Sequence, residues 1–571
     1  MKQVFLFSVL TLLIITAGCD DETNNGTNNS TNNTNNLNNT NNLNNTSTTN
    51  NLNNQNNQVV NPAWFEPDPE GRVTQNNLLG FAPEMVIVTS AELAEAWGAY
   101  AAMRTTTGML TTVVTMATVT EFADGRDDAE KLRNYLIELK ESGVTFVLFG
   151  GDREHVPFRR VENNLFIDTQ YTANGPSQIY FSNLEADFDT DGDGIYGEPG
   201  DDLSLEELRL TSLAVGRVPS GDAQEVYNYM HKFITYQSGM LGRTTYSLML
   251  SDVATTLPII GDIDGAEGVE MTYDAFFPQE FRSHVTKHYA TALACDNYGA
   301  TEATPQAIKT SMEAGFPMVF HNGHGSHGWF TDILNTAFVE GLTNEIPAVF
   351  ASCACLAGNF ADVATSNLYE DWSEQGPQDD SAGEVFINGE FGGVAYVGNT
   401  ASGLGALGGS QFLHSFYDAI FAQSITRIGE AFNYGHAHMN NSGWELPVIP
   451  FDMTDDSEWW THHVVILLGD PSLSIHTTES YPLKIAAPQS NSAGYTKLQV
   501  VVTDHQDTPV EGATVSILKD GDFYLEATSD SEGIATFAFM PYEPRNIEVG
   551  AVKEGALPGS HLRAGGPPVV H

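Results

Sequence analysis

Strand-like and helix-like segments alternate along most of this chain, and no other sequence feature restricts its fold as strongly. The expected strands are apolar runs, many of them β-branched, at 85–88, 109–116, 144–149, 213–216, 247–250, 284–289, 318–320, 349–351 and 394–397. The expected helices cover 92–107, 127–142, 220–237, a segment beginning at Thr304-Pro305, 410–422 and 428–438. Such alternation predicts an α/β fold in which helices cover both faces of a parallel sheet.

Two glycine-rich segments follow strands of this series and carry residue types with chemistry. His321 to His327 follows the strand at 317–320, and Ser352 to Phe360 follows the strand at 348–351. Because parallel strands place their carboxyl ends at one edge of a sheet, a histidine and a cysteine from these segments are expected side by side. A thiolate is a strong nucleophile, and an adjacent imidazole can ionise it and protonate a leaving group. The pattern predicts nucleophilic catalysis by a thiol.

The residues around this pair resemble those of a known family. The runs Gly323-His324-Gly325-Ser326 and Ala354-Cys355-Leu356-Ala357-Gly358-Asn359-Phe360 are similar to those of the gingipain family of cysteine peptidases, and the similarity extends over residues 81–476. The resemblance implies a caspase-like fold with His324 and Cys355 as the catalytic dyad. It also implies endopeptidase action on protein or peptide substrates through an acyl-enzyme.

The choice of nucleophile lies between Cys353 and Cys355. Two residues apart in an extended strand, both side chains would point the same way. The segment after the second cysteine fits the family pattern only if Cys355 is the nucleophile. Cys353 is then a packing residue or a disulfide partner, for which Cys295 is one possibility. We expect Cys355 to carry the reaction.

Further catalytic groups are expected around the dyad. Asp252 follows the strand at 247–250, where family members carry an acidic residue, and it is the candidate to orient His324. The alternative is a loop aspartate that faces water. The backbone N–H groups of Gly325 and Cys355 are the expected oxyanion donors.

The residues that select the substrate are less evident in the sequence. Asp262, Asp264 and Glu267 form an acidic loop at the place where relatives specific for basic residues carry a selectivity carboxylate. The loop at 398–409 is glycine-rich and lacks an aromatic wall for a long cationic side chain, which argues against such a preference. These three carboxylates are the specificity candidates.

An acidic segment predicts a structural calcium site. It fits the D-x-D-x-D-G-x5-E pattern, and the expected ligands are Asp187, Asp189, Asp191, Asp193 and Glu198. A second register from Asp189 to Asp201 or Asp202 is equally allowed, and an acidic turn without metal is the alternative. No strong helices flank the segment, so we expect a loop site rather than an EF-hand.

The N-terminus reads as a lipoprotein signal. Residues 1–18 form an export signal peptide, and Ile15-Thr16-Ala17-Gly18-Cys19 resembles a bacterial lipobox in which Cys19 becomes lipidated. Residues 19–60 are an Asn/Thr-rich linker whose polar composition predicts disorder. We expect attachment to a membrane of the cell envelope through this anchor, with plain secretion as the alternative.

The charge excludes one class of partner. With 24 Lys and Arg against 73 Asp and Glu, the formal net charge of −49 argues against nucleic-acid binding through phosphates. Adaptation to a saline habitat explains this composition, as does protection against self-cleavage by a protease specific for basic residues; we favour the former.

Four regions follow the linker: an N-terminal α/β subdomain at 81–240 with the calcium loop, a caspase-like catalytic subdomain at 241–478, a small β-sandwich at 479–554 and a loose tail at 555–571. Short alternating strands predict the sandwich, and the resemblance implies that it is immunoglobulin-like. A rival interpretation is a non-catalytic, calcium-stabilised surface binding protein on the same fold.

Overall fold

The computed structural model describes residues 83–562 apart from internal gaps. The gaps are 165–171, 199–200, 202, 239–241, 258–260, 331–333, 362–379, 405–407, 440–454, 479, 488–495, 520–522, 540–546, 554–555 and 558. The predictions for the signal peptide, for Cys19 and for the linker lie outside the described residues.

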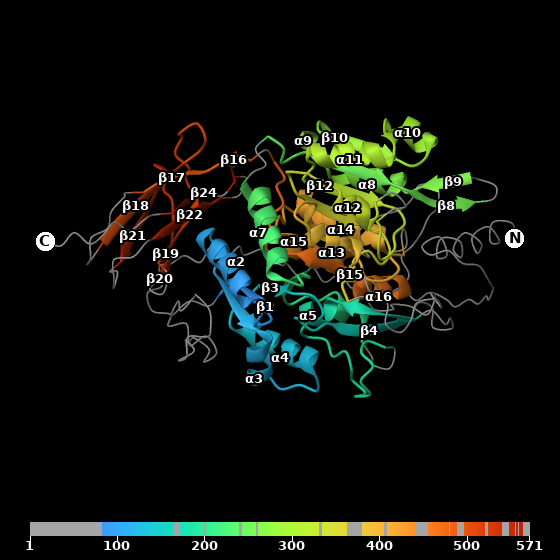
Figure 1. Cartoon of the computed structure of the whole chain (residues 1–571), viewed down its shortest axis with the longest axis horizontal. Coiled ribbons are helices and arrows are strands. Elements are labelled where there is room, and N and C mark those ends of the chain that lie inside the picture. The colour runs from blue at the N-terminus through green and yellow to red at the C-terminus, as the bar shows by residue number, and fades with distance from the viewer. Residues whose placement is uncertain are drawn as a thin grey trace, which may run out of the picture.

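One sheet of 11 strands runs through the α/β part of the chain (Figure 1). In spatial order its strands are β11 (Thr301–Glu302), β10 (Val285–Tyr289), β7 (Ser247–Ser251), β12 (Met318–Asn322), β13 (Ala348–Ser352), β14 (Gly393–Asn399), β15 (Val465–Gly469), β6 (Ala214–Val218), β3 (Phe146–Gly150), β1 (Met85–Thr89) and β2 (Thr111–Thr115). The two series of predicted strands are therefore joined in a single sheet.

The sheet has one antiparallel pairing, between β14 and β15, while its other neighbouring strands are parallel. The strands from β11 to β14 consequently run opposite to those from β15 to β2, and the two halves have their carboxyl ends at opposite edges. The sequence pattern does not predict β15, because it continues from α16 (Asp455–Val464) with no glycine or proline between them. The predicted histidine and cysteine both follow strands of the first half.

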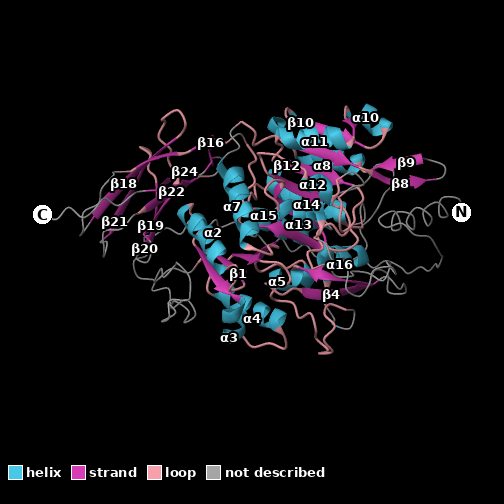
Figure 2. Cartoon of the chain, in the orientation of Figure 1, coloured by secondary structure: helices cyan, strands magenta, loops and turns pink. Residues whose placement is uncertain are grey.

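Helices cover both faces of this sheet (Figure 2). In β1, Val86 and Val88 pack with the helix α4, whereas Met85 and Ile87 pack with α2 on the other face. Burial on both faces explains the continuous apolar character of the strands. The longer helices are α2 (Ala94–Thr106), α3 (Met116–Phe122), α4 (Asp128–Glu141), α7 (Ala223–Ser238), α8 (Ala266–Phe276), α10 (Ala292–Tyr298), α11 (Pro305–Ala314), α13 (Ala382–Asn388), α14 (Gly409–Phe421) and α15 (Ile428–His438).

Side chains cap the first turns of two of the predicted helices. Asp127 accepts a hydrogen bond from the Glu130 N–H at the start of α4, and Thr304 caps α11 in the same way. The helix predicted from residue 92 begins only at Ala94, and its N-cap residue, Leu93, makes no side-chain capping bond. Short elements complete the α/β part: α5 (Ile179–Ser182), α6 (Leu205–Leu208), α9 (Gln279–Arg282), α12 (Thr336–Glu340) and the hairpins β4–β5 (Arg159–Asn164, Thr172–Ser177) and β8–β9 (Val253–Leu257, Gly261–Asp264).

The C-terminal part consists of antiparallel sheets, as the alternating pattern predicts. One sheet contains β17 (Lys484–Ala486), β18 (Thr496–Thr503) and β21 (Ile534–Phe539), and the other contains β20 (Phe523–Thr528), β19 (Thr514–Lys519), β22 (Glu548–Val552) and β24 (Gly559–Leu562). A two-stranded pair, β16 (Tyr481–Pro482) and β23 (Ala556–Leu557), lies beside them and is the exception, because it is parallel. The predicted boundary at 554 is too early, since β23 and β24 belong to these sheets. The sandwich packs on α2, where Ser516 Oγ donates to the Thr106 carbonyl at 3.1 Å.

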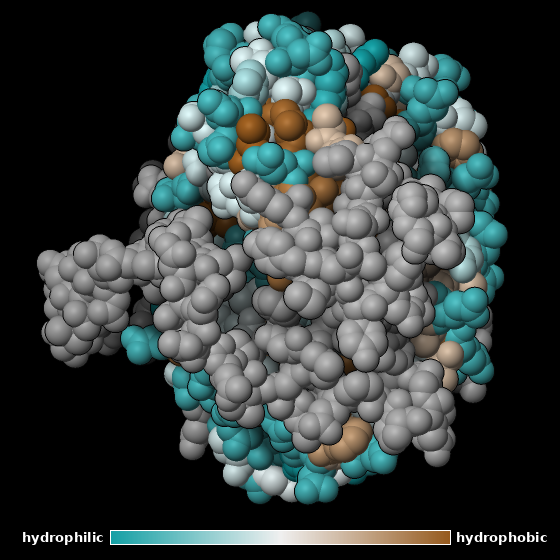
Figure 3. All heavy atoms as spheres, turned by 90° about the vertical axis from the view of Figure 1, so that its left-hand side faces the viewer, coloured by the Kyte–Doolittle hydropathy of each residue, from teal (hydrophilic) through white to brown (hydrophobic). Residues whose placement is uncertain are grey.

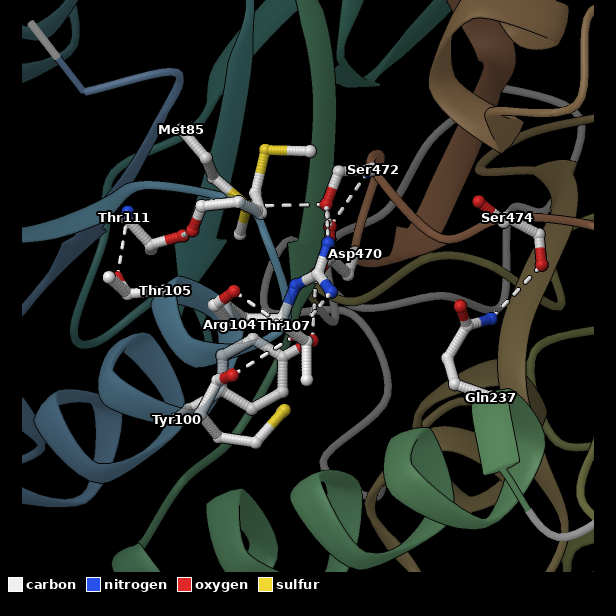
Figure 4. A network of polar contacts seen from close by, with 12 residues as sticks. Met85, Tyr100, Arg104, Thr105, Thr107, Thr111, Gln237, Asp470, Ser472 and Ser474 are labelled. Carbon is white, nitrogen blue, oxygen red and sulfur yellow. Dashed lines mark hydrogen bonds and ion pairs between the residues drawn. The ribbon is translucent and has the colours of Figure 1, made fainter. Parts of the chain in front are cut away.

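The segment at 468–473, which includes the end of β15, has a structural role (Figure 4). Asp470 is fully buried and accepts hydrogen bonds from Tyr100 Oη at 2.7 Å and from Ser472 N at 2.7 Å. It also pairs with Arg104 Nε at 3.3 Å. This network ties the end of β15 to α2.

The described surface is largely hydrophilic on the face shown in Figure 3, with a smaller hydrophobic area near its top. That character agrees with the charge of −49. Within the described residues, no helix has both the length and the apolar character needed to cross a membrane.

Candidate active site

Four adjacent strands end at one edge of the sheet and deliver the candidate residues. These strands are β7, β12, β13 and β14, and each is paired in parallel with the next. Asp252 follows β7, the turn with His324 follows β12, and Cys355 follows β13. The carboxyl edge of a parallel sheet is where open α/β folds place their active sites.

The turn carrying His324 fits between its two neighbours because both flanking residues are glycine. A Cβ on Gly323 would lie 2.5 Å from the Cβ of Asp252, and a Cβ on Gly325 would lie 2.5 Å from Ala354 Cβ and 3.1 Å from Cys355 N. Any side chain at either position would force the turns apart. The three predicted residues Asp252, His324 and Cys355 therefore belong to touching segments.

Cys355 is buried and lies in a tight turn. The Gly403 N–H donates a hydrogen bond to its Sγ at 3.3 Å. The next residue, Leu356, has φ 59°, a left-handed conformation that is unusual for a residue with a branched side chain. Such strain persists only where the surrounding structure enforces it, and it clusters at functional sites.

Cys353 faces a different environment. It is buried, and its Sγ donates to Asn322 Oδ1 at 2.6 Å. Burial raises the pKa of this thiol to about 11. Since the thiolate is the nucleophilic form, Cys353 is suited to packing rather than to attack. Among the described residues, no disulfide joins Cys295 and Cys353, so the bridge considered from the sequence is absent.

Buried polar side chains at the ends of β12 and β13 support the turn that carries the two cysteines. His321 Nδ1 lies 2.8 Å from Ser352 Oγ, which also accepts a hydrogen bond from Ala354 N at 3.0 Å. Burial lowers the pKa of His321 to about 3, so its ring is neutral. This histidine therefore serves the backbone of the cysteine turn.

Asp252 is held by the backbone around it. Its N–H donates to the Asn322 carbonyl at 3.2 Å, and its carbonyl accepts from Gly265 N at 2.9 Å. Its Oδ1 accepts from Val253 N at 2.8 Å. The residue is half-buried against the histidine turn, in the place expected for a group that orients His324.

The acidic segment at 262–267 is not a loop, which corrects that expectation. Residues up to Asp264 form β9, and α8 begins at Ala266, so that Glu267 lies in its first turn. Both oxygens of Asp264 have donors: Ser251 Oγ and Ala266 N contact Oδ1, and Thr291 N lies 2.8 Å from Oδ2. Asp264 thereby anchors α8 to the sheet. Asp262 lies on β9 opposite Thr256.

The calcium candidates form a tight acidic loop. Oxygens of Asp189, Asp191 and Asp193, the residues that both registers share, lie within 4.8 Å of one another. Asp191 Oδ1 accepts from Asp193 N at 3.1 Å, and Asp189 also pairs with Arg126. These are oxygen donors of the kind that a hard divalent cation binds.

The outer members of the calcium registers differ in their surroundings. Asp201 is buried and accepts hydrogen bonds from Thr190 N at 2.7 Å and Gly197 N at 2.8 Å, so it shapes the loop from inside. Asp187 is exposed, and its Oδ1 accepts from Asp189 N at 3.1 Å. Glu198 is half-buried at the end of the loop.

Sequence reasoning missed Asn399 and Gly403, which contact the cysteine turn. The available signal was their position directly after a predicted strand neighbouring that of Cys355. Their loop was considered only for substrate selection, because a backbone N–H donated to sulfur leaves no pattern in the sequence.

A thiol and an imidazole on touching turns, at the carboxyl edge of a caspase-like sheet, define a cysteine-peptidase type of protein. The chain belongs to peptidase family C25, whose model matches residues 80–476. This membership confirms the gingipain-type resemblance and implies protein or peptide substrates.

Solved structures agree on the fold. The crystal structure of the Arg-specific cysteine proteinase gingipain R (RGPB) is 15% identical, with a TM-score of 0.59 over 85% of this chain and 98% of that one. The complex of Porphyromonas gingivalis RgpB pro- and mature domains is 14% identical, with a TM-score of 0.56 over 84% and 99%. Comparison with curated proteins gives no significant match.

Proposed function

We propose that this chain is an extracytoplasmic cysteine endopeptidase in which Cys355 is the nucleophile and His324 the acid–base partner. The observation that carries the proposal is the close approach of Gly325 to Cys355, because it places the two residues on contacting turns. The raised pKa of Cys353 supports the choice between the two thiols.

The reaction follows from these roles. Cys355 Sγ attacks the scissile carbonyl carbon as its proton passes to His324, and the carbonyl oxygen becomes an oxyanion that the N–H groups of Gly325 and Cys355 stabilise. The C–N bond breaks, and the leaving amine takes the proton from His324. Water then hydrolyses the thioester with His324 as base, which releases the acid and restores the thiol. Asp252 orients the imidazole throughout.

Calcium would hold the loop at 187–198 together. The carboxylates of Asp189, Asp191 and Asp193 would bind the ion, and Arg126 offsets part of their charge without it. The role is structural, since the ion would neutralise carboxylates packed into one turn.

The proposed location is the cell envelope, with Cys19 as a lipid anchor. Cys19→Ser should then release the protein from membranes and abolish acyl labelling. If the wild-type protein is found in the medium instead, ordinary secretion would replace lipid anchoring as the explanation of its location.

A labelling experiment separates the peptidase from the binding-protein alternative. A peptidyl acyloxymethyl ketone should modify Cys355, and substrate peptides should slow the modification. Peptide mapping locates the label. Absence of both label and cleavage of a peptide library would favour the non-catalytic protein.

A further inference from the structure

The segment Asn399 to Gly403, here the 399–403 loop, lies against the turn that carries Cys355. Four hydrogen bonds join the two: Leu356 N to Ala401 O at 2.9 Å, Gly358 N to Asn399 O at 3.0 Å, Asn399 Nδ2 to Ala354 O at 3.1 Å, and Gly403 N to Cys355 Sγ at 3.3 Å. One loop thus binds the N–H groups of Leu356 and Gly358 after the nucleophile and the carbonyl of Ala354 before it.

The contact with sulfur has a chemical consequence. A hydrogen bond donated to the charged form of an acid favours that form, so an N–H aimed at Sγ stabilises a thiolate. Gly403 reaches this position only because it has no side chain. A Cβ there would lie 2.3 Å from Cys353 O and 2.4 Å from Asn399 Nδ2.

Asn399 holds the turn rather than the sulfur. It is 1% exposed, and its amide bridges from the end of β14 to the carbonyl of Ala354, the residue before the nucleophile. Leu356, after the nucleophile, keeps its left-handed φ of 59° while its N–H is bound to Ala401. The loop therefore fixes the residues on either side of Cys355.

The loop is itself fastened to the fold on its far side. Trp460 Nε1 donates to Ser402 O at 2.6 Å, and Thr400 Oγ1 donates to Pro176 O at 2.9 Å. The Thr400 N–H donates to Val464 O at 2.8 Å. These anchors come from β5 and from α16, whose last residue is Val464, so the Gly403 N–H has a fixed direction.

We propose that the 399–403 loop positions and activates the nucleophile, with Gly403 N–H stabilising the Cys355 thiolate and the Asn399 amide holding its turn. This inference rests on the proposed function, in which Cys355 is the reacting thiol. Asn399 is a positioning residue, whereas Gly403 touches the reacting atom.

The test measures the pH dependence of Cys355 alkylation by iodoacetamide, read by peptide mapping, together with kcat/KM for a cleaved peptide. Gly403→Ala should shift the alkylation midpoint upward by about one pH unit, a tenfold loss of thiolate at neutral pH. Asn399→Ala and the isosteric Asn399→Asp, which removes the amide donor, should each lower kcat/KM by about tenfold. Thr111→Ala is the matched control, since it also removes a buried hydroxyl that donates to a backbone carbonyl, that of Met109 at 2.7 Å, but lies in β2 at the far edge of the sheet. It should keep the wild-type midpoint and a rate within about twofold.

The outcomes separate the two proposals. Wild-type protein that cleaves no peptide, with no preferential alkylation at Cys355, would overturn the proposed function. An active wild type whose midpoint is unchanged in Gly403→Ala, and whose rate is unchanged in both Asn399 variants, would overturn only the role of the loop. If Gly403→Ala fails to fold, the two Asn399 variants decide, because equal losses in them and in Thr111→Ala would reveal general destabilisation.

Discussion

The Cys353 thiol donates a hydrogen bond to Asn322 Oδ1 at 2.6 Å, and this contact separates the two neighbouring cysteines chemically. Asn322 in turn donates from Nδ2 to the Gly265 carbonyl at 2.8 Å. Cys353 is thereby tied to the end of β12, whereas the sulfur of Cys355 accepts the N–H of Gly403 from the 399–403 loop.

The first prediction concerns these two residues. Cys355→Ala should abolish peptide cleavage, whereas Cys353→Ala should retain most of it because its thiol, with a pKa of about 11, is protonated at neutral pH. Both thiols are buried, so both variants should lose a modest amount of stability, about 1 kcal/mol. Activity and urea-unfolding curves check this, and the reverse pattern of activity would identify Cys353 as the nucleophile.

The strand series and the two glycine-rich turns could be predicted because each depends on local sequence. The runs that end at Phe320 and Ala351 are apolar, and Gly323 and Gly325 indicate that backbones approach each other closely there. The reversal at β15 could not be predicted, since it depends on pairing between segments far apart in sequence. The role of Asp264 could not be predicted either, because its hydrogen-bond donors come from β7, from α8 and from the N-cap residue of α10.

The second prediction concerns calcium. A cation that binds only the folded state stabilises it by about 2.7 kcal/mol at a concentration 100 times its Kd. Chelator should therefore lower Tm by several degrees, and a double Asp191→Asn, Asp193→Asn variant should melt low with or without it. Asp187→Asn distinguishes the two calcium registers, because it weakens calcium binding only if the register begins at Asp187. If the wild type has the same Tm with calcium and with chelator, the loop is an acidic turn that binds no calcium.

The third prediction concerns acid. Burial lowers the pKa of His414 and His476 to about 4 and of His463 to about 3. The folded pKa lies below the unfolded value of about 6.5, so the unfolded state binds more protons in acid. Stability is full above about pH 6.5 and falls as pH drops toward 4.

Unfolding curves at pH 7.5, 6.0 and 5.0 measure this loss, to which each such histidine adds up to about 1.4 kcal/mol per pH unit. His414→Asn should reduce the slope of the unfolding free energy against pH by the contribution of one histidine. Mutation of the exposed His505 should leave this slope unchanged. Constant stability from pH 7.5 to 5.0 would contradict neutral burial of these rings.

The fourth prediction concerns Asp470. Asp470→Asn leaves the Arg104 guanidinium, which is 4% exposed, without its carboxylate partner. Removing one member of a buried pair costs about 3–5 kcal/mol. Asp507→Asn is the matched control, because its pair with Lys484 is exposed and should contribute at most about 1 kcal/mol. Similar unfolding free energies for the two variants would show that the network adds little.

The last prediction concerns substrate charge. Both oxygens of Asp264 accept hydrogen bonds within the fold, so this carboxylate is not available to pair with a cationic side chain of a substrate. Attraction of basic peptides must then come mainly from the net charge of −49, acting over distance.

At low salt we expect kcat/KM for Lys- or Arg-containing peptides to exceed that for matched acidic peptides. The gap should close as salt rises, because the Debye length is about 10 Å at 0.1 M and about 3 Å at 1 M. A gap that persists at 1 M salt would indicate a carboxylate close to the bound side chain, and Glu267→Gln and Asp262→Asn would test the two remaining candidates. Asp264→Asn should instead lower stability and leave the charge preference unchanged, since its contacts anchor α8. Equal rates at every salt concentration would show that the charge of the protein does not select its substrates.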